Sequence, residues 1–207
     1  MRKLIVAAFV SLDGVLQGPG GPKEDTHGDF AHGGWTVPFA DAVFGETMDA
    51  LFAQPFELVL GRRTYDIFAA HWPRVPADNG DAGLAALFNG VTKHVATHRP
   101  DALDWQNSRA LGGDVIGALR MLKDQDGPDL LTQGSGALVQ QLLATDLVDI
   151  LQLMTFPVLL GAGKRLFGDD AQAVTFSLQT SVVSPTGIVV SRYTRGGEVE
   201  TGSFGLD

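Results

Sequence analysis

The chain has 207 residues, 44% of them hydrophobic, and a formal net charge of −9 at pH 7. This length and composition suit one α/β domain with a sizeable core, which we expect over residues 1–195, followed by a flexible tail at 196–207. The negative charge argues against nucleic acid and anionic membranes as partners, because both need a basic surface. The lack of cysteine excludes disulfides and thiolate chemistry and fits a cytoplasmic protein.

Seven segments have the apolar character of β-strands. They are Leu4–Val10, Phe56–Leu60, Lys93–Thr97, Asp129–Thr132, Val148–Phe156, Val174–Val183 and Gly187–Thr194. The early segments are short and continuously apolar, as strands covered on both faces are. The last two flank a Ser-Pro-Thr-Gly turn at residues 184–187, which predicts a C-terminal antiparallel hairpin.

Helical patterns lie between most of these strands. They cover Phe39–Phe52, Arg63–Ala70, Asp81–Phe88, Asp114–Lys123 and Ser135–Ala144. Alternating strands and helices predict right-handed crossovers and a mostly parallel sheet between two helical layers. The glycine- and proline-rich loop Gln17–Trp35 is long for a compact domain, so we expect it to serve a site as a lid, with Trp35 either packing or covering a substrate ring.

Two strand-to-helix junctions carry residues suited to an anion. In "LVLGRRTYDIF", Gly61 permits a turn, Thr64 offers a hydroxyl, and Arg62 and Arg63 bring positive charge to a helix start. Cations are unfavourable there, so a bound phosphate or a pairing carboxylate such as Asp66 must compensate, and the sequence leaves both open. In "LTQGSGALVQQLL", a glycine pair precedes a helix, which suits either a phosphate or a plain turn.

A third strand end adds Thr97, His98 and Arg99 in "KHVATHRP". The carboxyl ends of parallel strands are where open α/β sheets bind ligands. The three motifs together describe a groove for a phosphorylated dinucleotide. Asp13 follows the first strand in "FVSLDGV", where it is either a turn residue that bonds its own backbone or a proton donor at the same edge.

The order of "SLDG", "LGRRTYDIF", "KHVATHR", "GSGALVQQLL" and "DILQLMTFPVLLGAGKRLF" resembles the dihydrofolate reductase superfamily, and within it the RibD C-terminal domain family of riboflavin biosynthesis reductases. The resemblance implies a three-layer α/β fold with a central sheet of about eight strands. It also implies NADPH as hydride donor, a homodimer, and reduction of a small heterocyclic or ribosylamino substrate, as in the phosphoribosylaminouracil reductases.

The resemblance assigns the candidate site residues by position. Asp13 is the catalytic candidate, and the cofactor candidates are Gly61, Arg62, Arg63, Thr64, Thr97, His98, Arg99, Gly134, Ser135, Gly136 and Leu138. The segments at residues 61–64 and 97–99 resemble the adenosine side, and residues 134–138 resemble the pyrophosphate turn. Arg62 and Arg99 are expected at the 2′-phosphate, and Arg63 near the pyrophosphate.

Two departures bear on the substrate. Riboflavin-pathway reductases tend to continue "SLDG" with an arginine or similar polar residue, whereas Val15 stands here, which argues against a phosphoribosyl substrate. Folate reductases carry an acid on the first long helix, and the acids available there are Asp41, Glu46 and Asp49. The spacing of the histidines predicts no metal site. The alternative function is a binding protein for nucleotides or other small molecules that keeps the fold without turnover.

Overall fold

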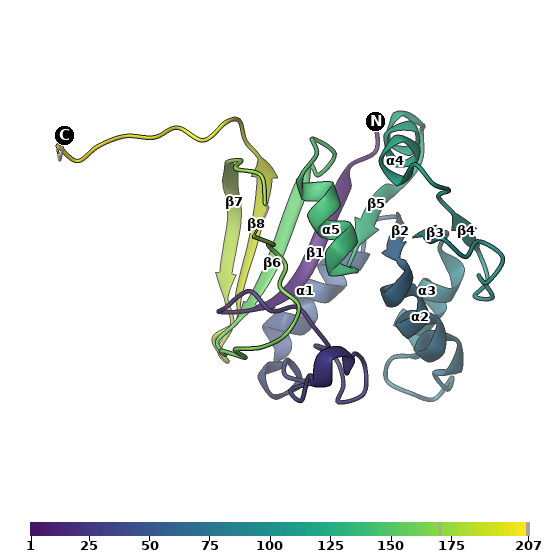
Figure 1. Ribbon diagram of the computed structural model, residues 1–207. Coiled ribbons are helices and arrows are strands. Elements are labelled where there is room, and N and C mark those ends of the chain that lie inside the picture. Colours follow the sequence, from purple (N-terminus) through teal and green to yellow (C-terminus); the bar gives the residue numbers. More distant parts are fainter. Residues whose placement is uncertain (170, 206–207) are drawn as a thin grey trace.

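The computed structural model describes residues 1–169 and 171–205. Its centre is a mixed sheet of eight strands in the order β4-β3-β2-β5-β1-β6-β8-β7 (Figure 1). The strands are β1 (Leu4–Ser11), β2 (Phe56–Gly61), β3 (Lys93–Ala96), β4 (Ser108–Ala110), β5 (Asp129–Thr132), β6 (Ile150–Phe156), β7 (Phe176–Val183) and β8 (Val189–Arg195). The strands from β4 to β6 run parallel, and β8 pairs antiparallel with β6 and β7. This arrangement confirms the predicted sheet.

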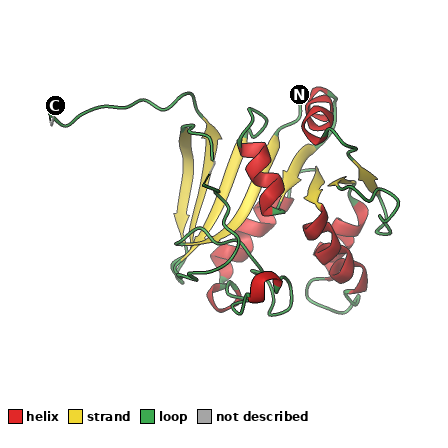
Figure 2. Cartoon of the chain, viewed as in Figure 1, coloured by secondary structure: helices red, strands yellow, loops and turns green. Residues whose placement is uncertain are grey.

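Helices cover both faces of the sheet (Figure 2). They are α1 (Ala42–Phe52), α2 (Arg62–His71), α3 (Ala82–Gly90), α4 (Val115–Asp124) and α5 (Gly136–Leu143), with 3-10 turns η1 (His27–Asp29), η2 (Val37–Phe39) and η3 (Trp72–Arg74). Side chains of α1, α2 and α3 join one core cluster, and those of α4 and α5 join the other. The result is the three-layer fold that the sequence predicts.

The central position of β1 in the sheet explains why its sequence lacks a polar face. Ala7 contributes to one core cluster, and its neighbours Val6 and Ala8 contribute to the other. Successive side chains of a strand point to opposite faces, so a central strand with helices on both sides needs apolar residues throughout. The continuous apolar run is therefore the mark of a doubly covered strand.

The structure differs from the sequence prediction at a few boundaries. The strand β4 was not predicted, because its three residues, Ser-Arg-Ala, carry no apolar run. The first helix begins at Ala42 instead of Phe39, since the Asp41 side chain accepts a hydrogen bond from the Phe44 amide at 2.9 Å and caps the helix there. The C-terminal segment stays paired with Thr175 as far as Gly197, and beyond it the chain extends away from the sheet (Figure 1).

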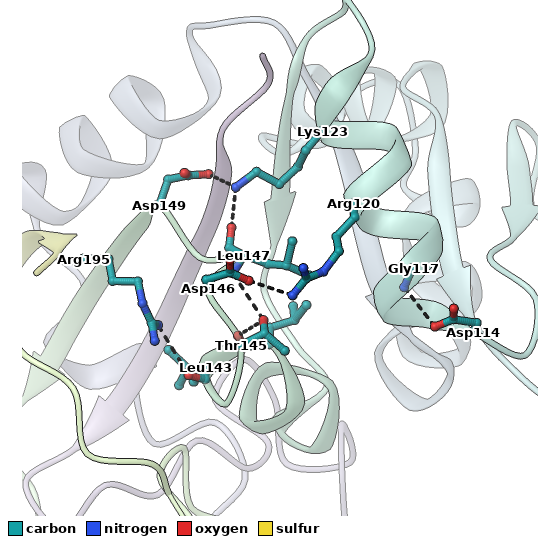
Figure 3. A network of polar contacts seen from close by, with 11 residues as sticks. Asp114, Gly117, Arg120, Lys123, Leu143, Thr145, Asp146, Leu147, Asp149 and Arg195 are labelled. Atoms are coloured by element: carbon teal, nitrogen blue, oxygen red, sulfur yellow. Dashed lines mark hydrogen bonds and ion pairs between the residues drawn. The ribbon is translucent and has the colours of Figure 1, made fainter. Parts of the chain in front are cut away.

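The amino-terminal ends of the strands carry a network of polar contacts (Figure 3). Lys123 at the end of α4 donates to the Asp149 carboxylate at 2.5 Å and to the Leu147 carbonyl at 2.6 Å. Asp149 also accepts from the Leu4 amide at 2.7 Å. These bonds tie α4 to the starts of β1 and β6.

In the described part of the chain, no helix is long and apolar enough to span a membrane.

Candidate functional site

The three strands that carry the predicted motifs are neighbours in the sheet. β3, β2 and β5 lie side by side, with β1 next in order, and all four run parallel. Their carboxyl ends therefore open at the same edge, where the structure brings together the segments that follow Gly61, Ala96 and Thr132. This edge is the lower one in Figure 1.

Two glycines bring the β2 and β5 turns into close contact. A Cβ atom on Gly61 would lie 2.0 Å from the Ser135 Oγ, so no larger residue fits there. Gly134 has a φ of +134°, and a Cβ on it would lie 2.8 Å from the Thr64 Oγ1. The Gly61 amide donates to the Gly134 carbonyl at 3.2 Å. The starts of α2 and α5 are thereby held beside each other.

Both helices that begin here present amide groups to the edge. Gly61 and Ser135 are the N-cap residues of α2 and α5, and neither makes a side-chain cap hydrogen bond. The first amides of an α-helix have no partner within it and carry partial positive charge. The side chain of Leu138, the last residue of the predicted pyrophosphate segment, is 4% exposed and lies in the core.

Arg62 and Arg99 converge on one carboxylate beside these helix starts. The Arg62 Nε lies 2.8 Å from Asp66, and the Arg99 Nη2 lies 3.5 Å from it. Arg62 also donates to the Thr97 hydroxyl at 3.4 Å and to the Arg99 carbonyl at 3.2 Å. His98 is exposed beside this cluster. The pairing carboxylate that the sequence allowed is present, but it opposes two guanidinium groups with one negative charge.

Arg63 points to a different partner. Its Nη2 lies 2.7 Å from Asp25, which also accepts from the Lys164 Nζ at 2.6 Å. Burial alone would raise the pKa of Asp25, but hydrogen bonds from Lys164, the His27 amide and Arg63 outweigh it and hold the pKa below its usual value. Asp25 is therefore an ionised carboxylate that joins the 17–35 loop to two cations.

A cavity of about 720 Å³ lies against these turns. It is lined by Thr64, Ser135, Gly136 and the β1 residues Ala7 and Ala8. Its lining also includes six aromatic side chains, Phe9, Phe44, Phe52, Phe68, Trp72 and Phe88. An apolar cavity with a few convergent polar groups is the usual form of a small-molecule site.

Asp13 lies outside the residues that line this cavity. Its carboxylate accepts from the Ser11 hydroxyl at 2.6 Å and from the amides of Leu160 and Gly161 at 3.1 and 2.9 Å. The hydrogen bond from Ser11, followed by those from the two amides, lowers the pKa of Asp13 to about 2. Asp13 thus joins the turn after β1 to the segment at Leu160 and Gly161, and a carboxyl with so low a pKa is a poor proton donor near neutral pH.

A model of the RibD C-terminal domain matches residues 2–190. The chain belongs to the RibD C-terminal domain family. The uncharacterized protein YyaP of Bacillus subtilis is 23% identical over 188 residues, which cover 91% of this chain and 92% of YyaP.

Two solved structures show the same fold. A Shewanella protein assigned to riboflavin biosynthesis matches with a TM-score of 0.65 and 22% identity, over 94% of this chain and 99% of the other. Dihydrofolate reductase from Enterococcus faecalis, solved with NADP(H), matches with a TM-score of 0.58 and 16% identity, over 93% of this chain and 96% of the other. The dihydrofolate-reductase-like fold of this RibD C-terminal domain is thus shown.

Sequence reasoning missed two acids and a lysine of the RibD C-terminal domain's cavity. Glu24, Asp25 and Lys164 all line it. Burial raises the pKa of Glu24 above its usual value, against hydrogen bonds from the Gly20 and Gly21 amides that lower it. Glu24 and Asp25 belong to the loop predicted as a lid, and Lys164 belongs to "LLGAGKRLF". The only signal in the sequence that these three residues could belong to the site was their position in those two segments.

The remaining loop and helix candidates have structural contacts. Trp35 is buried, donates from its indole nitrogen to the Gln17 carbonyl at 2.8 Å, and meets Phe156 edge-on; it packs in the core. The Gln17 side chain donates to the Asp25 and His27 carbonyls. Gln17, Glu24 and Asp25 of this loop line the cavity. From α1, Phe44, Met48 and Phe52 line the cavity, whereas Glu46 and Asp49 are exposed.

Among the described residues, no cluster of three or more acidic, histidine or cysteine side chains is arranged to hold a metal ion.

Proposed function

We propose that this protein is a cytoplasmic, NADPH-dependent reductase of a small heterocyclic substrate. The observation that carries the proposal is that one cavity is lined both by the glycine turn after β5 and by six aromatic side chains. A reductase needs its cofactor's reactive ring and its substrate in contact within one space that excludes water. Membership of the RibD C-terminal domain family supports the same reaction class.

The residues at the sheet edge fit a phosphorylated dinucleotide. A Cβ atom at Gly61 or at Gly134 would clash with the neighbouring turn, so these glycines allow the starts of α2 and α5 to lie side by side. Two adjacent helix starts suit a pyrophosphate. Arg62, Thr97 and Arg99 form a cluster with an excess of positive charge, which suits the 2′-phosphate of NADPH. When bound, the cofactor supplies the hydride. Arg63 joins the cofactor region to the loop through Asp25.

Glu24 is the proposed source of the proton. It lines the cavity, and burial raises the pKa of its carboxyl. A carboxylic acid that keeps its proton nearer to neutral pH can donate to a substrate nitrogen or oxygen. Asp13, with a pKa of about 2 and its carboxylate bonded to main-chain amides, is unsuited to that role.

Loss of NADPH absorbance in the presence of pterins, pyrimidines and quinones tests the function. We expect turnover with at least one class, and a Glu24→Gln variant should reduce kcat by roughly 10², the usual scale for a positioned proton donor. Asp13→Asn is the matched control and should retain most of the turnover. NADPH binding without turnover across the panel would instead support the non-catalytic alternative.

The homodimer belongs to this proposal as well. β7 is an edge strand whose residues from Ser177 to Val183 are exposed, and it contains no charged residue. Uncharged, exposed edge strands tend to pair with another chain. A second copy on β7 would cover Leu178, Val182 and Val183. Sedimentation at micromolar concentration should give twice the chain mass, and a monomer would exclude the dimer.

A further inference from the structure

The chain contains the dipeptide Asn-Gly twice, and the two copies lie at opposite ends of α3. Asn79 and Gly80 precede the helix, whereas Asn89 and Gly90 are its last two residues. In such a pair the main-chain nitrogen of glycine can attack the side-chain amide carbon of asparagine, because glycine has no Cβ atom to hinder the approach. The structure surrounds the two pairs differently, so we expect them to differ in reactivity.

This reaction needs only water as a partner. The glycine nitrogen gives up its proton and forms a bond to the amide carbon, which closes a succinimide ring and expels the side-chain nitrogen as ammonia. Water then opens the ring at either of its two carbonyl carbons. One product is aspartate. The other is isoaspartate, in which the main chain runs through the former side chain and is longer by a CH₂ group. Each product adds a negative charge to the chain.

The first pair lies in an exposed turn that favours this attack. Asn79 and Gly80 are both exposed, and the Asn79 Oδ1 accepts a hydrogen bond from the Asp81 amide at 2.8 Å. That bond closes a ring of atoms that contains the Gly80 peptide, so it keeps the side-chain carbonyl beside the attacking nitrogen. It also stabilises the negative charge that the carbonyl oxygen gains during the attack. In the described part of the chain, the Gly80 amide donates no main-chain hydrogen bond.

The second pair is held by its contacts. The Asn89 Nδ2 donates to the Trp72 carbonyl at 3.3 Å, and the Asn89 Oδ1 accepts from the Trp105 indole nitrogen at 2.7 Å. Asn89 and Gly90 also belong to α3, where the main-chain nitrogen takes part in the hydrogen bonds of the helix. An attack at this position requires the end of α3 and both side-chain bonds to open first.

We propose that Asn79 is a site of spontaneous deamidation in the folded protein and that the structure protects Asn89. The modification converts Asn79 to aspartate and isoaspartate. The added charge lies two residues from Asp81, which lines the cavity of about 720 Å³. This proposal is independent of the proposed function, because it concerns the chemistry of the chain itself.

Ageing of the full chain at neutral pH, followed by peptide mapping with mass spectrometry, tests the proposal. Replacement of NH₂ by OH makes the modified peptide heavier. We expect Asn79 to convert at least about tenfold faster than Asn89 in the folded chain, because Asn89 reacts only from an opened state. In urea, which unfolds the chain, the two positions should convert at similar rates, since both have glycine as the next residue.

Gly80→Ala is the matched variant. A Cβ atom on Gly80 would meet no other atom within 4 Å, so we expect the variant to fold as the wild type does. The same Cβ atom hinders the attack, and conversion of Asn79 should therefore slow by about tenfold or more.

Three results would overturn the proposal. The first is equal conversion of Asn79 and Asn89 in the folded chain. The second is an intact Asn79 in the folded chain under conditions in which both positions convert in urea. The third is conversion of Asn79 in Gly80→Ala as fast as in the wild type, because it would exclude attack by the following nitrogen.

The isoaspartate product should also loosen the start of α3. The Asn79 carbonyl accepts from the Ala82 amide at 3.0 Å, and a longer main chain displaces this carbonyl. Because α3 supplies Leu84 and Phe88 to the cavity, the change reaches its lining. We expect faster hydrogen exchange in α3 of the isoaspartate form, separated by anion exchange, than in fresh Asn79→Asp, which adds the charge without lengthening the main chain. Equal exchange in the two forms would contradict this consequence.

Discussion

The two ends of the parallel strands use charge in opposite ways. At the amino-terminal end, buried Arg2 pairs with Glu57 at 2.5 Å, and Glu57 also contacts His94 at 2.8 Å. Lys123 and Asp149 form a second paired unit at the same end (Figure 3). At the carboxyl end, Arg62 and Arg99 share one exposed carboxylate beside two helix starts. One end neutralises its charges internally, while the other keeps positive charge available to a ligand.

From this difference we infer which residues contribute mainly to stability and which contribute mainly to ligand binding. A buried ion pair costs several kcal/mol when one partner is removed, because the other charge stays buried. An exposed pair contributes about 0–1 kcal/mol, so its groups can change partners cheaply. We therefore expect substitutions at the amino end to change folding and those at the carboxyl end to change ligand affinity.

The largest expected effect is at the amino end. Glu57→Gln should lower the free energy of unfolding by roughly 3–5 kcal/mol, because it leaves buried Arg2 without a carboxylate, while NADPH affinity of the folded protein stays unchanged. Asp146→Asn removes the exposed Arg120–Asp146 pair at the same end and should cost under about 0.5 kcal/mol. Denaturant titration compares the two, and equal losses would remove the distinction between buried and exposed pairs.

The loss in Glu57→Gln should depend on pH. Burial raises the pKa of Glu57, but hydrogen bonds from His94 and Arg2 outweigh it and lower the pKa below 4.5. A carboxyl with a lowered folded pKa stabilises the protein above its unfolded pKa, and this contribution is lost as the pH falls through the folded value. The gap between wild type and variant should therefore narrow below about pH 4.5. A gap that stays constant down to pH 3 would contradict this.

The next effect concerns binding. Arg62→Ala should weaken NADPH by about 10- to 150-fold, which corresponds to roughly 1.5–3 kcal/mol for a hydrogen bond to a charged group. NADH lacks the 2′-phosphate and should be little affected. Arg120→Ala removes an exposed arginine at the amino end and serves as control. Calorimetric titration with both cofactors decides the matter: equal losses for NADPH and NADH would place Arg62 at the shared pyrophosphate.

The smallest effect is at Asp13. Asp13→Asn should cost about 1 kcal/mol of stability, since an amide replaces a carboxylate that accepts from main-chain donors. Because the folded pKa is about 2 and the usual value is 3.8, the contribution is present above pH 3.8 and lost as the pH falls toward 2. Acid titration of the variant should lack this step. A large loss of turnover with intact stability would restore the proton-donor role.

Local patterns in the sequence predicted the sheet and the placement of the glycine turns. The apolar run at Leu4–Val10 and the junctions at Gly61 and Gly134 each depend on neighbours within a few residues. The contacts of Asp25 with Lys164 and of Asp13 with Leu160 span 139 and 147 residues. Such pairs depend on how the 17–35 loop and the "LLGAGKRLF" segment meet in space, which no local spacing encodes. The burial of Leu138 likewise follows from the packing of α5.

The central claim is that the carboxyl end of the sheet is a nicotinamide cofactor site, and thermal unfolding with increasing NADPH tests it most directly. A ligand that binds only the folded state at 100 times its Kd should add roughly 2.7 kcal/mol to the free energy of unfolding. We predict this stabilisation in the wild type and in Asp146→Asn, with a smaller one in Arg62→Ala at the same concentration. A melting temperature that does not change at millimolar NADPH in the wild type would contradict the account.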